Sequence, residues 1–583
     1  MGRTPAHVAR WRARRRSSPL WAVVAVSIML LTLLPLVTIL LIAFAPSGFI
    51  SFGPLVQGPS IWPHLFATVL PNALYQTVML IFGTGFVTLV IGISAAWLIT
   101  MYRFPGREVL DRLMVLPLAI PTYIIAYCYV EFLDFTGPVQ TFVRTLTGAT
   151  LARDYWFPQV RSLGGTILVL SSVLYPYVYL SARASFVQQS VCVLEVARTL
   201  GRSPLGTFWS VALPLSRPAL AAGVALVLME CLNDIGAVQY LGVQTLTSSI
   251  YDTWLQRSNL AGAAQLASTL LLFVVLMLAV ERLARGQARH HHTTGRYRAI
   301  PFHDLNGYKG IAAFIICLMP FVFGFVIPFF VLLRHAIVFA NDSLALGFLS
   351  AAWNSISLAA LAAGLAVALA LALAYARRVS QNAITLVAVR LSGLGYAIPG
   401  TVLALGLLFP LAAFDNGLDA IFQSLFGIST GLILSGSIFA LVLAYAIRFL
   451  AVSLGSTEAG LERISSNLDA ASRTLGENAL STLWRVHMPL LLPALGAAAM
   501  LVFVDAMKEL PATLLLRPFN FDTLATHVFG LAQNEQFEEA ALGALTIVLV
   551  GLVPVLFLHS AVTSGRPGRD ETGASGIVET PVL

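Results

Sequence analysis

The segment EVARTLGRSPLGTFWSVALPLSRPAL, residues 195–220, decides how the chain is organised, because a close copy of it follows later in the sequence. The copy is AASRTLGENALSTLWRVHMPLLLPAL, residues 470–495, and aligning Gly201 with Gly476 sets the offset at 275 residues. The match is ungapped, and its shared positions are Thr199-Leu200-Gly201, Leu205, Thr207, Trp209, Val211, Pro214 and Pro218-Ala219-Leu220. Identity at so many polar or bulky positions indicates an internal repeat.

The composition indicates an integral membrane protein with many spans. Of the 583 residues, 58% are hydrophobic and only 11% are charged, and no soluble domain needs so much apolar surface. About twelve apolar runs reach the roughly 20 residues that a membrane-spanning helix requires. They lie near 20–45, 73–100, 113–133, 164–182, 216–241, 263–281, 311–337, 354–376, 389–413, 430–453, 491–515 and 540–561. Because the backbone must satisfy its own hydrogen bonds in lipid, these runs predict an all-α polytopic membrane protein.

The repeat divides the chain into two homologous halves. The LAIP sequence at 118–121 is answered by YAIP at 396–399, and Asn72 is answered by Asn354. An even number of spans per half predicts parallel repeats, which bring both polar loops to the same membrane face. We expect these segments: a basic N-terminus 1–18, a first half 19–284, a linker 285–310, a second half 311–561, and a tail 562–583 of disordered composition.

Arginine sets the expected orientation, because loops on the cytoplasmic side are enriched in basic residues. The N-terminus carries RWRARRR at 10–16, whereas residues 46–72 and 414–429 contain no Lys or Arg. Both termini, the linker, the tail and both repeated loops are therefore expected in the cytoplasm of a bacterium, with the chain in its inner membrane. The basic residues are scattered over separate loops, so we expect no nucleic-acid partner.

Each repeated loop has the pattern of a short amphipathic helix joined to a membrane span. Val193, Leu194, Ala197 and Leu200 recur at helical spacing. Gly201 is expected to end this helix, and Pro214 to begin the next span. Such a helix could transmit force from a cytoplasmic partner, or it could be an ordinary connector on the lipid surface. Two matched copies favour the first interpretation.

The loops resemble a motif of ATP-binding-cassette importer permeases, the EAA loop, on the basis of Glu195, Ala197, Gly201 and Pro214. The second copy differs, because Ala470 occupies the Glu position and Asp469 lies one residue earlier. Its matching candidates are Asp469, Ala471, Gly476 and Pro489. The resemblance covers nearly the whole chain and implies a type I importer permease fold in each half. It also implies coupling helices, about 193–215 and 468–490, that dock on two copies of a cytoplasmic ATPase.

The ATPase itself is not expected in this chain. A phosphate-binding P-loop needs a Lys followed by Ser or Thr after a glycine-rich turn. The only lysines are Lys309 and Lys508, which precede Gly310 and Glu509. We therefore expect a membrane component that is not an enzyme and holds no cofactor, with ATP and magnesium bound by the partner.

Charged residues after each coupling loop are candidates for the translocation path or its gate. They are Glu230, Asn233 and Asp234 in the first half and Lys508 and Glu509 in the second. Ionisable groups at membrane depth are costly and often functional. The alternative is an ion pair that merely joins the halves, for example between Asp234 and Lys508.

The cargo is suggested by resemblance alone. KELPATLLLRPFNFDTLA (508–525) and LNDIGAVQYLGVQTLTSSIY (232–251) resemble fused two-half permeases of ferric-iron importers. That implies a periplasmic binding protein that delivers the ion. No dense set of oxygen or nitrogen ligands marks an iron site, so any metal ligands are unknown at this stage. Related permeases for thiamine, phosphonates or polyamines remain alternatives, and a secondary transporter is a more distant one, because it has no need for the duplicated loop.

Overall fold

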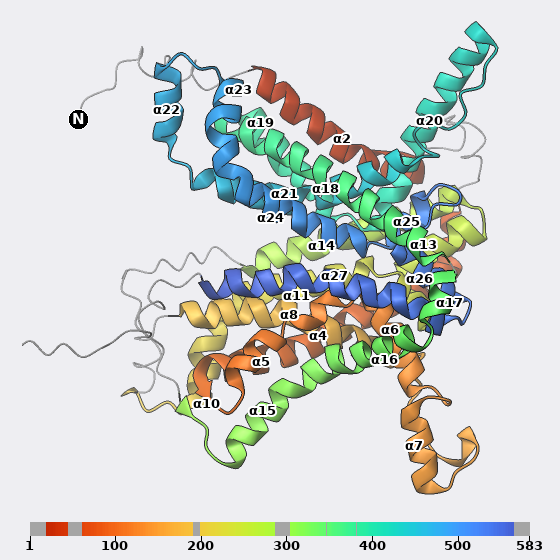
Figure 1. Ribbon diagram of the computed structural model, residues 1–583, viewed down its shortest axis with the longest axis vertical. Helices are drawn as coiled ribbons and strands as arrows, with labels where there is room; N and C mark the ends of the chain where they lie inside the picture. Colours follow the sequence, from red (N-terminus) through yellow and green to blue (C-terminus); the bar gives the residue numbers. More distant parts are fainter. Residues whose placement is uncertain are drawn as a thin grey trace, which may run out of the picture.

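The computed structural model describes residues 19–44, 61–189, 199–285, 303–345, 347–380 and 382–564. The expected N-terminal segment 1–18 and most of the linker and tail lie outside these residues. The part of the chain that is described is almost wholly helical (Figure 1).

The first half contains fourteen α-helical or 3-10 segments and three π-helical turns in its described residues. In chain order they are α2 (Pro19–Phe44), α3 (Trp62–His64), the π-helical turn η2 (Leu65–Val69), α4 (Leu70–Met101), α5 (Arg107–Leu113), the 3-10 turn η3 (Leu116–Ala119), α6 (Thr122–Leu133), α7 (Pro138–Thr147), the 3-10 turn η4 (Ala152–Asp154), α8 (Leu163–Gln188), α10 (Pro204–Thr207), the π-helical turn η5 (Phe208–Ala212), α11 (Leu213–Asn233), α12 (Gly236–Tyr240), α13 (Leu246–Tyr251), the π-helical turn η6 (Asp252–Gln256) and α14 (Leu260–Arg285).

The second half has a similar order of long helices, with one unbroken helix where the first half has two, but its π-helical turns lie at partly different places. Its elements are α15 (Tyr308–Phe321), the π-helical turn η7 (Val322–Val326), α16 (Ile327–Val338), α17 (Ala340–Ala345), α18 (Phe348–Val379), α19 (Ala383–Ser392), the 3-10 turn η8 (Gly393–Ala397), α20 (Gly400–Phe426), α21 (Ile438–Glu462), α22 (Ser466–Thr474), α23 (Ala479–Thr482), the π-helical turn η9 (Leu483–His487), α24 (Met488–Met507), α25 (Pro511–Leu516), α26 (Leu524–Gln533) and α27 (Phe537–Ser564). Here α20 takes the place of α6 and α7.

The expected number of spans is confirmed. Among the described residues, eleven helical runs are long and apolar enough to cross a membrane, and one bent pair makes a twelfth. The bent pair, Arg107–Ala119 and Thr122–Thr147, turns through 98°. The turn falls at the LAIP sequence, where Ile120 is extended, as the residue before a proline prefers.

The two halves have the same internal packing and run in the same direction. In the first half α4, α8 and α11 pack on one another, and in the second half α18, α21 and α24 do the same. The coupling-loop elements α10 and α22 lie at one end of the molecule, and α7 and the tip of α20 project from the other (Figure 1). This arrangement agrees with parallel repeats.

The first membrane helix of each half packs against the other half. α2 contacts α18, α19 and α20, and α16 contacts α6. A Cβ atom on Gly406 of α20 would lie 2.3 Å from the Pro35 carbonyl oxygen of α2, so only glycine allows this contact. The Tyr129 hydroxyl of α6 donates to the Phe323 carbonyl in η7 at 2.7 Å. The two halves are therefore interlocked.

A short strand pair attaches the start of the second half to the first. β1 (Tyr102–Arg103), which follows α4, pairs in parallel with β2 (His303–Asp304), which precedes α15. The Leu305 amide extends the pairing by donating to the Arg103 carbonyl at 2.9 Å.

A π-helical turn precedes a proline in four membrane-crossing helices of the described chain, namely at Pro71, Pro214, Pro328 and Pro489. Proline has no amide hydrogen and its ring crowds the carbonyl four residues earlier, so the turn before it widens. Pro214 therefore does not begin a span, and that prediction was wrong. The helix runs without a break through α10, η5 and α11, and the second half does the same through Pro489.

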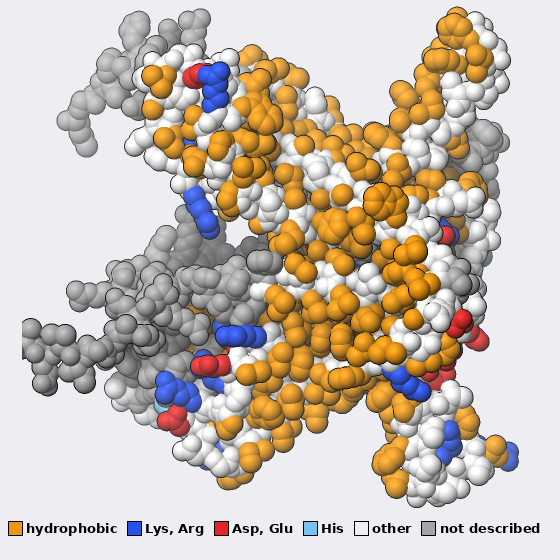
Figure 2. All heavy atoms as spheres, viewed as in Figure 1, with side chains coloured by type: hydrophobic (Ala, Val, Ile, Leu, Met, Phe, Trp, Pro, Cys, Tyr) orange, Lys and Arg blue, Asp and Glu red, His pale blue; other side chains and the backbone are white. Residues whose placement is uncertain are grey.

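The surface has the distribution of side chains that a membrane requires. Hydrophobic side chains cover the middle of the face in Figure 2, and charged side chains gather toward its two ends. The apolar middle contains the long helices, so the ends are the parts that face water.

Candidate functional site

A small polar pocket lies between the two halves and is built from equivalent positions of both. Its volume is about 130 Å³. Seven pairs of its lining residues are related by the 275-residue offset: Val173 with Arg448, Leu174 with Phe449, Glu230 with Asp505, Asn233 with Lys508, Asp234 with Glu509, Ile235 with Leu510, and Gly236 with Pro511. Equivalent residues of two parallel repeats meet in this way at the axis that relates the repeats. We therefore call this cavity the axial pocket.

A carboxylate caps a short helix at the same position in each half. Asp234 follows α11 and accepts hydrogen bonds from the amides of Ala237 and Val238 in α12, at 2.9 and 3.1 Å. Glu509 follows α24 and accepts from the amides of Ala512 and Thr513 in α25, also at 2.9 and 3.1 Å. Amides at a helix N-terminus have no partner within the helix, so a carboxylate there is stabilised. Both carboxylates are buried, with 6% and 4% of the residue exposed.

Two further candidates, Asn233 and Glu230, join the two halves across the axial pocket. The Gly400 amide, at the start of α20, donates to the side-chain oxygen of Asn233 at 2.8 Å. The Tyr396 hydroxyl donates to Glu230 at 3.5 Å. The structure thus brings Glu230, Asn233 and Asp234 into one pocket with Lys508 and Glu509.

The ion pair suggested between Asp234 and Lys508 is not formed. The Lys508 ammonium contacts Asp505 of its own half at 2.9 Å, and Asp234 instead accepts from the hydroxyl of Thr122 as well as from its two capping amides. The physical reason is local: Asp505 lies one helical turn before Lys508, whereas Asp234 is already satisfied by donors beside it.

The axial pocket is asymmetric in charge. The second half adds Arg448 of α21, whose guanidinium contacts Glu509 at 3.0 Å, and the equivalent position in the first half is Val173. In total the pocket holds the carboxylates Glu230, Asp234, Asp505 and Glu509 and the cations Arg448 and Lys508. Acidic side chains are therefore in excess. Among the described residues, no group of three or more His, Cys, Asp or Glu side chains is arranged to hold a metal ion.

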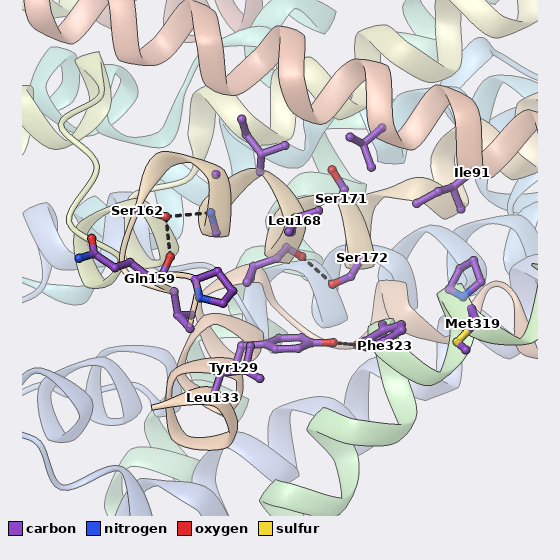
Figure 3. Close-up of a pocket in the computed structure, with 18 of the residues that line it drawn as sticks. Ile91, Tyr129, Leu133, Gln159, Ser162, Leu168, Ser171, Ser172, Met319 and Phe323 are labelled. Carbon is purple, nitrogen blue, oxygen red and sulfur yellow. Dashed lines mark hydrogen bonds between the residues drawn. The ribbon is translucent and has the colours of Figure 1, made fainter. Parts of the chain in front are cut away.

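A much larger cavity lies elsewhere and does not have the features of a path. It has a volume of about 1200 Å³ and is lined by α4, α6, α8, α15 and the loop before α8. Figure 3 shows mostly apolar side chains around it, such as Leu168 and Met319, with Tyr129 bonded to Phe323 at its side. Leu168 and Met319 are also exposed on the outer, apolar surface of the helices. This cavity is therefore lateral, and it lacks the equivalent residue pairs that define the axial pocket.

The second coupling loop is a helix that ends at a left-handed glycine. α22 is capped by Ser465, whose hydroxyl accepts from the Asn467 amide. At the other end Gly476 has φ +82°, and the Glu477 amide donates to the Ser472 carbonyl at 3.1 Å. This is the bond pattern of a glycine-terminated helix. In the first loop Gly201 has φ +77°, so both glycines adopt a backbone conformation that disfavours other residues.

Asp469 anchors α22 inside the chain. It accepts from the Arg378 guanidinium of α18 at 2.9 Å and lies 2.8 Å from a ring nitrogen of His487 in η9. Only 19% of the Asp469 side chain is exposed. Asp469 therefore attaches α22 to two membrane-spanning helices.

The other coupling candidates have different positions. Ala471 is exposed on α22, and Pro489 is exposed at the start of α24. Glu195 and Ala197 lie outside the described residues.

Exposed apolar side chains occupy matching positions in the two loops. Leu200 and Leu475, which directly precede the two glycines, are 78% and 83% exposed. Trp209 and Trp484 are 62% and 57% exposed. A pair of exposed leucines at the water-facing end, repeated with the same offset, has the character of a surface that a partner covers.

Several residues of the site were missed by sequence reasoning. Arg448, Asp505 and Tyr396 lie within or beside apolar runs, and their distance in sequence from the other candidates concealed their shared pocket. The offset of 275 residues from Glu230 would have identified Asp505, but no sequence signal points to Arg448, because its counterpart is Val173.

Comparison with known proteins places these features among transport proteins. Residues 88–289, which include the first coupling loop, match the model of the family described as "Binding-protein-dependent transport system inner membrane component". The chain is 28% identical over 498 residues to the Fe(3+)-transport system permease protein FbpB 2 of Haemophilus influenzae, covering 85% of this chain and 90% of the relative. It is 23% identical over 506 residues to the ferric transport system permease protein FbpB of Actinobacillus pleuropneumoniae, covering 83% and 70%. It is also 31% identical over 195 residues to the sulfate transport system permease protein CysT of Salmonella typhimurium, covering 32% and 67%.

Proposed function

Because the chain belongs to the family of binding-protein-dependent transport system inner membrane components, we propose that it is the complete transmembrane permease of an importer driven by a separate ATPase. The duplication supports this proposal, since one chain supplies both halves of a two-fold pore. Two coupling loops suit two copies of the ATPase, which bind ATP and magnesium, so that this chain needs no cofactor of its own.

The axial pocket is proposed as part of the translocation path, in its closed state. The pocket lies on the axis between the halves, and Glu230, Asn233 and Asp234 share it with Lys508 and Glu509. The bond from the Gly400 amide to Asn233 joins the halves across it. A path opened along this axis must break that bond, so these residues are gate candidates.

The proposed cargo is ferric ion delivered by a periplasmic binding protein. The observation that carries this choice is the excess of carboxylates in the axial pocket, together with the phenol groups of Tyr123, Tyr177 and Tyr396. Oxygen ligands suit hard cations, and a cleft of one sign of charge attracts ions of the opposite sign. The same charges disfavour sulfate or a phosphonate. Three relatives that match most of this chain have names that specify ferric iron or ferric transport.

The coupling loops are proposed to face the cytoplasm. The exposed Leu200 and Leu475 and the two left-handed glycines would contact the ATPase, together with Glu195 and Ala197 of the first loop and Ala471 of α22, with Pro214 and Pro489 on the helices that follow. Asp469 would hold its helix in position from within. This orientation also places the segment 1–18, the linker 285–310 and the tail 562–583 in the cytoplasm of the bacterium.

The test is uptake of labelled cargo by cells that lack the chain, with and without its restoration. Ferric ion, sulfate, thiamine, a phosphonate and a polyamine are measured in parallel. We expect only ferric uptake to return, and to require both ATP and the binding protein. Restoration of another solute with no change in ferric uptake would refute the cargo and leave the permease assignment intact.

A further inference from the structure

Arg448 is one of two cations that break the two-fold symmetry of the axial pocket; the other is Lys508, whose counterpart is Asn233. It lies on α21, and the equivalent position on α8 is Val173. Its guanidinium is 3.0 Å from Glu509, and the two side chains are only 12% and 1% exposed. A buried ion pair of this kind costs desolvation of both ions, so its presence in one half only calls for a reason.

Glu509 does not need Arg448 for its structural role. Its carboxylate already accepts from the Ala512 and Thr513 amides and, at 2.8 Å, from the Thr513 hydroxyl. Asp234 caps the equivalent helix with amides and the neutral hydroxyl of Thr122. What Arg448 adds is therefore positive charge.

A glycine in the backbone leaves room for the Arg448 guanidinium. Gly400 begins α20, and a Cβ atom there would lie 2.1 Å from the guanidinium nitrogen of Arg448 and 2.9 Å from the Glu509 carboxylate. The position equivalent to Gly400 in the first half is Thr122, directly after the matching LAIP and YAIP sequences, three residues earlier than the 275-residue offset predicts. In the first half, the Thr122 side chain therefore occupies the space that the Arg448 guanidinium occupies in the second half.

The pocket also contains an oxygen atom without a protein partner. Tyr123 lines it and is 3% exposed, and its hydroxyl forms no hydrogen bond within the described part of the chain. A buried hydroxyl normally has a partner, so this group points to a ligand that enters the pocket.

We propose that Arg448 is a tethered counter-ion, which occupies the place of a cation beside Glu509 in the closed pocket and must leave that carboxylate when cation cargo passes. This inference rests on the proposed transport of a cation through the axial pocket. Lys508 contacts Asp505 at 2.9 Å, and both of these side chains are 31% exposed. Lys508 therefore neutralises the carboxylates Glu230 and Asp505 less completely than the buried Arg448 neutralises Glu509.

As a consequence, the closed axial pocket would exclude ambient cations. With Arg448 in place, ambient cations find Glu509 already paired. Without it, four carboxylates face one lysine, and the pocket attracts any small cation that reaches it.

The experiment uses the complete complex in liposomes: this chain, its ATPase and its binding protein. ATP-driven uptake of ferric ion by the wild type tests the proposed function. Entry of Mn²⁺ without ATP or binding protein, followed by quenching of an enclosed fluorophore, tests the counter-ion. We expect Arg448→Gln to raise passive Mn²⁺ entry by about tenfold or more, the lower end of the enrichment that a charged cleft produces.

Three further variants separate charge from packing. Arg448→Lys keeps the cation, and Arg448→Gln combined with Glu509→Gln removes both charges while glutamine can still cap α25, so both should remain near the wild-type rate. Arg377→Gln is the matched control, because Arg377 forms an Arg–Glu pair of 2.7 Å with Glu458 outside the pocket.

Two results would overturn the inference. One is no increase of passive Mn²⁺ entry in Arg448→Gln. The other is an equal increase of passive Mn²⁺ entry in the double variant, which would indicate a packing defect. Wild-type complex that shows no ferric uptake, with Mn²⁺ entry still responding to Arg448 as expected, would instead refute the cargo alone.

Discussion

Substitution of Gly476 tests the coupling loop more sharply than any other change in this chain. Gly476 ends α22 with φ +82°, and a Cβ atom there would have no neighbour within 4 Å. Gly427 ends α20 at the opposite end of the molecule with φ +68°, and its Cβ position is equally open. Gly476 and Gly427 therefore have the same left-handed backbone and the same free space around their Cβ positions, but they lie at opposite ends of the molecule.

The structure sets the size of the effect on folding. A residue other than glycine costs about 1–2 kcal/mol in the left-handed conformation, and an open Cβ position adds no clash. Gly476→Ala, Gly476→Trp and the same changes at Gly427 should each lower the free energy of unfolding by about 1 kcal/mol. Each protein should therefore still insert and assemble.

The effect on transport should separate the four variants. If the loop docks on the ATPase, a tryptophan at Gly476 projects into the contact and weakens it by about 2 kcal/mol, which corresponds to about thirtyfold in affinity. ATP-driven uptake in liposomes should fall accordingly for Gly476→Trp, whereas Gly476→Ala and both Gly427 variants should retain most of it. Affinity for the ATPase, measured by titration of detached subunits, provides the direct readout.

Either of two outcomes would refute this reasoning. Full uptake by Gly476→Trp would mean that the loop does not lie in the contact. An equal loss in Gly427→Trp would mean that backbone strain, and not docking, accounts for the effect.

Three further changes test other contacts. Asp469→Ala removes the carboxylate that pairs with Arg378 among side chains that are less than 20% exposed, and leaves that guanidinium only its bonds to the Leu461 and Ile464 carbonyls. The change should lower the free energy of unfolding by about 2–3 kcal/mol, seen as a lower thermal midpoint together with reduced uptake; an unchanged midpoint would contradict the anchoring role. Gly406→Val places a side chain against a carbonyl of α2, where even a Cβ would come within 2.3 Å, and should prevent crosslinking between α2 and α20, whereas Gly417→Val on the same helix, with open space around it, should not. Tyr129→Phe removes one bond between the halves and should cost about 1 kcal/mol, so a thermal midpoint equal to the wild type would show that this bond adds nothing.

The candidate site was predictable from the sequence to the extent that it follows from the repeat. Asp234 and Glu509 were found because both copies carry an acid at the same offset, and the structure gives both the same capping role. The suggested ion pair between Asp234 and Lys508 was wrong, because Lys508 pairs with Asp505 one helical turn earlier and Asp234 is satisfied by donors beside it. Arg448 was missed because the repeat places valine at its counterpart.

The sequence by itself determined the membrane class, the number of spans and the two parallel halves. These follow from local hydropathy and from the ungapped match of residues 195–220 with 470–495, and both are properties of the order of residues along the chain. Only the tertiary structure decided that the first helix of each half packs on the other half and that Arg448 enters the axial pocket. Each of these depends on which surfaces meet in space: Gly406 allows α2 to approach, and Gly400 leaves room for a guanidinium beside Glu509. Such contacts join residues far apart in the sequence, so no local pattern records them.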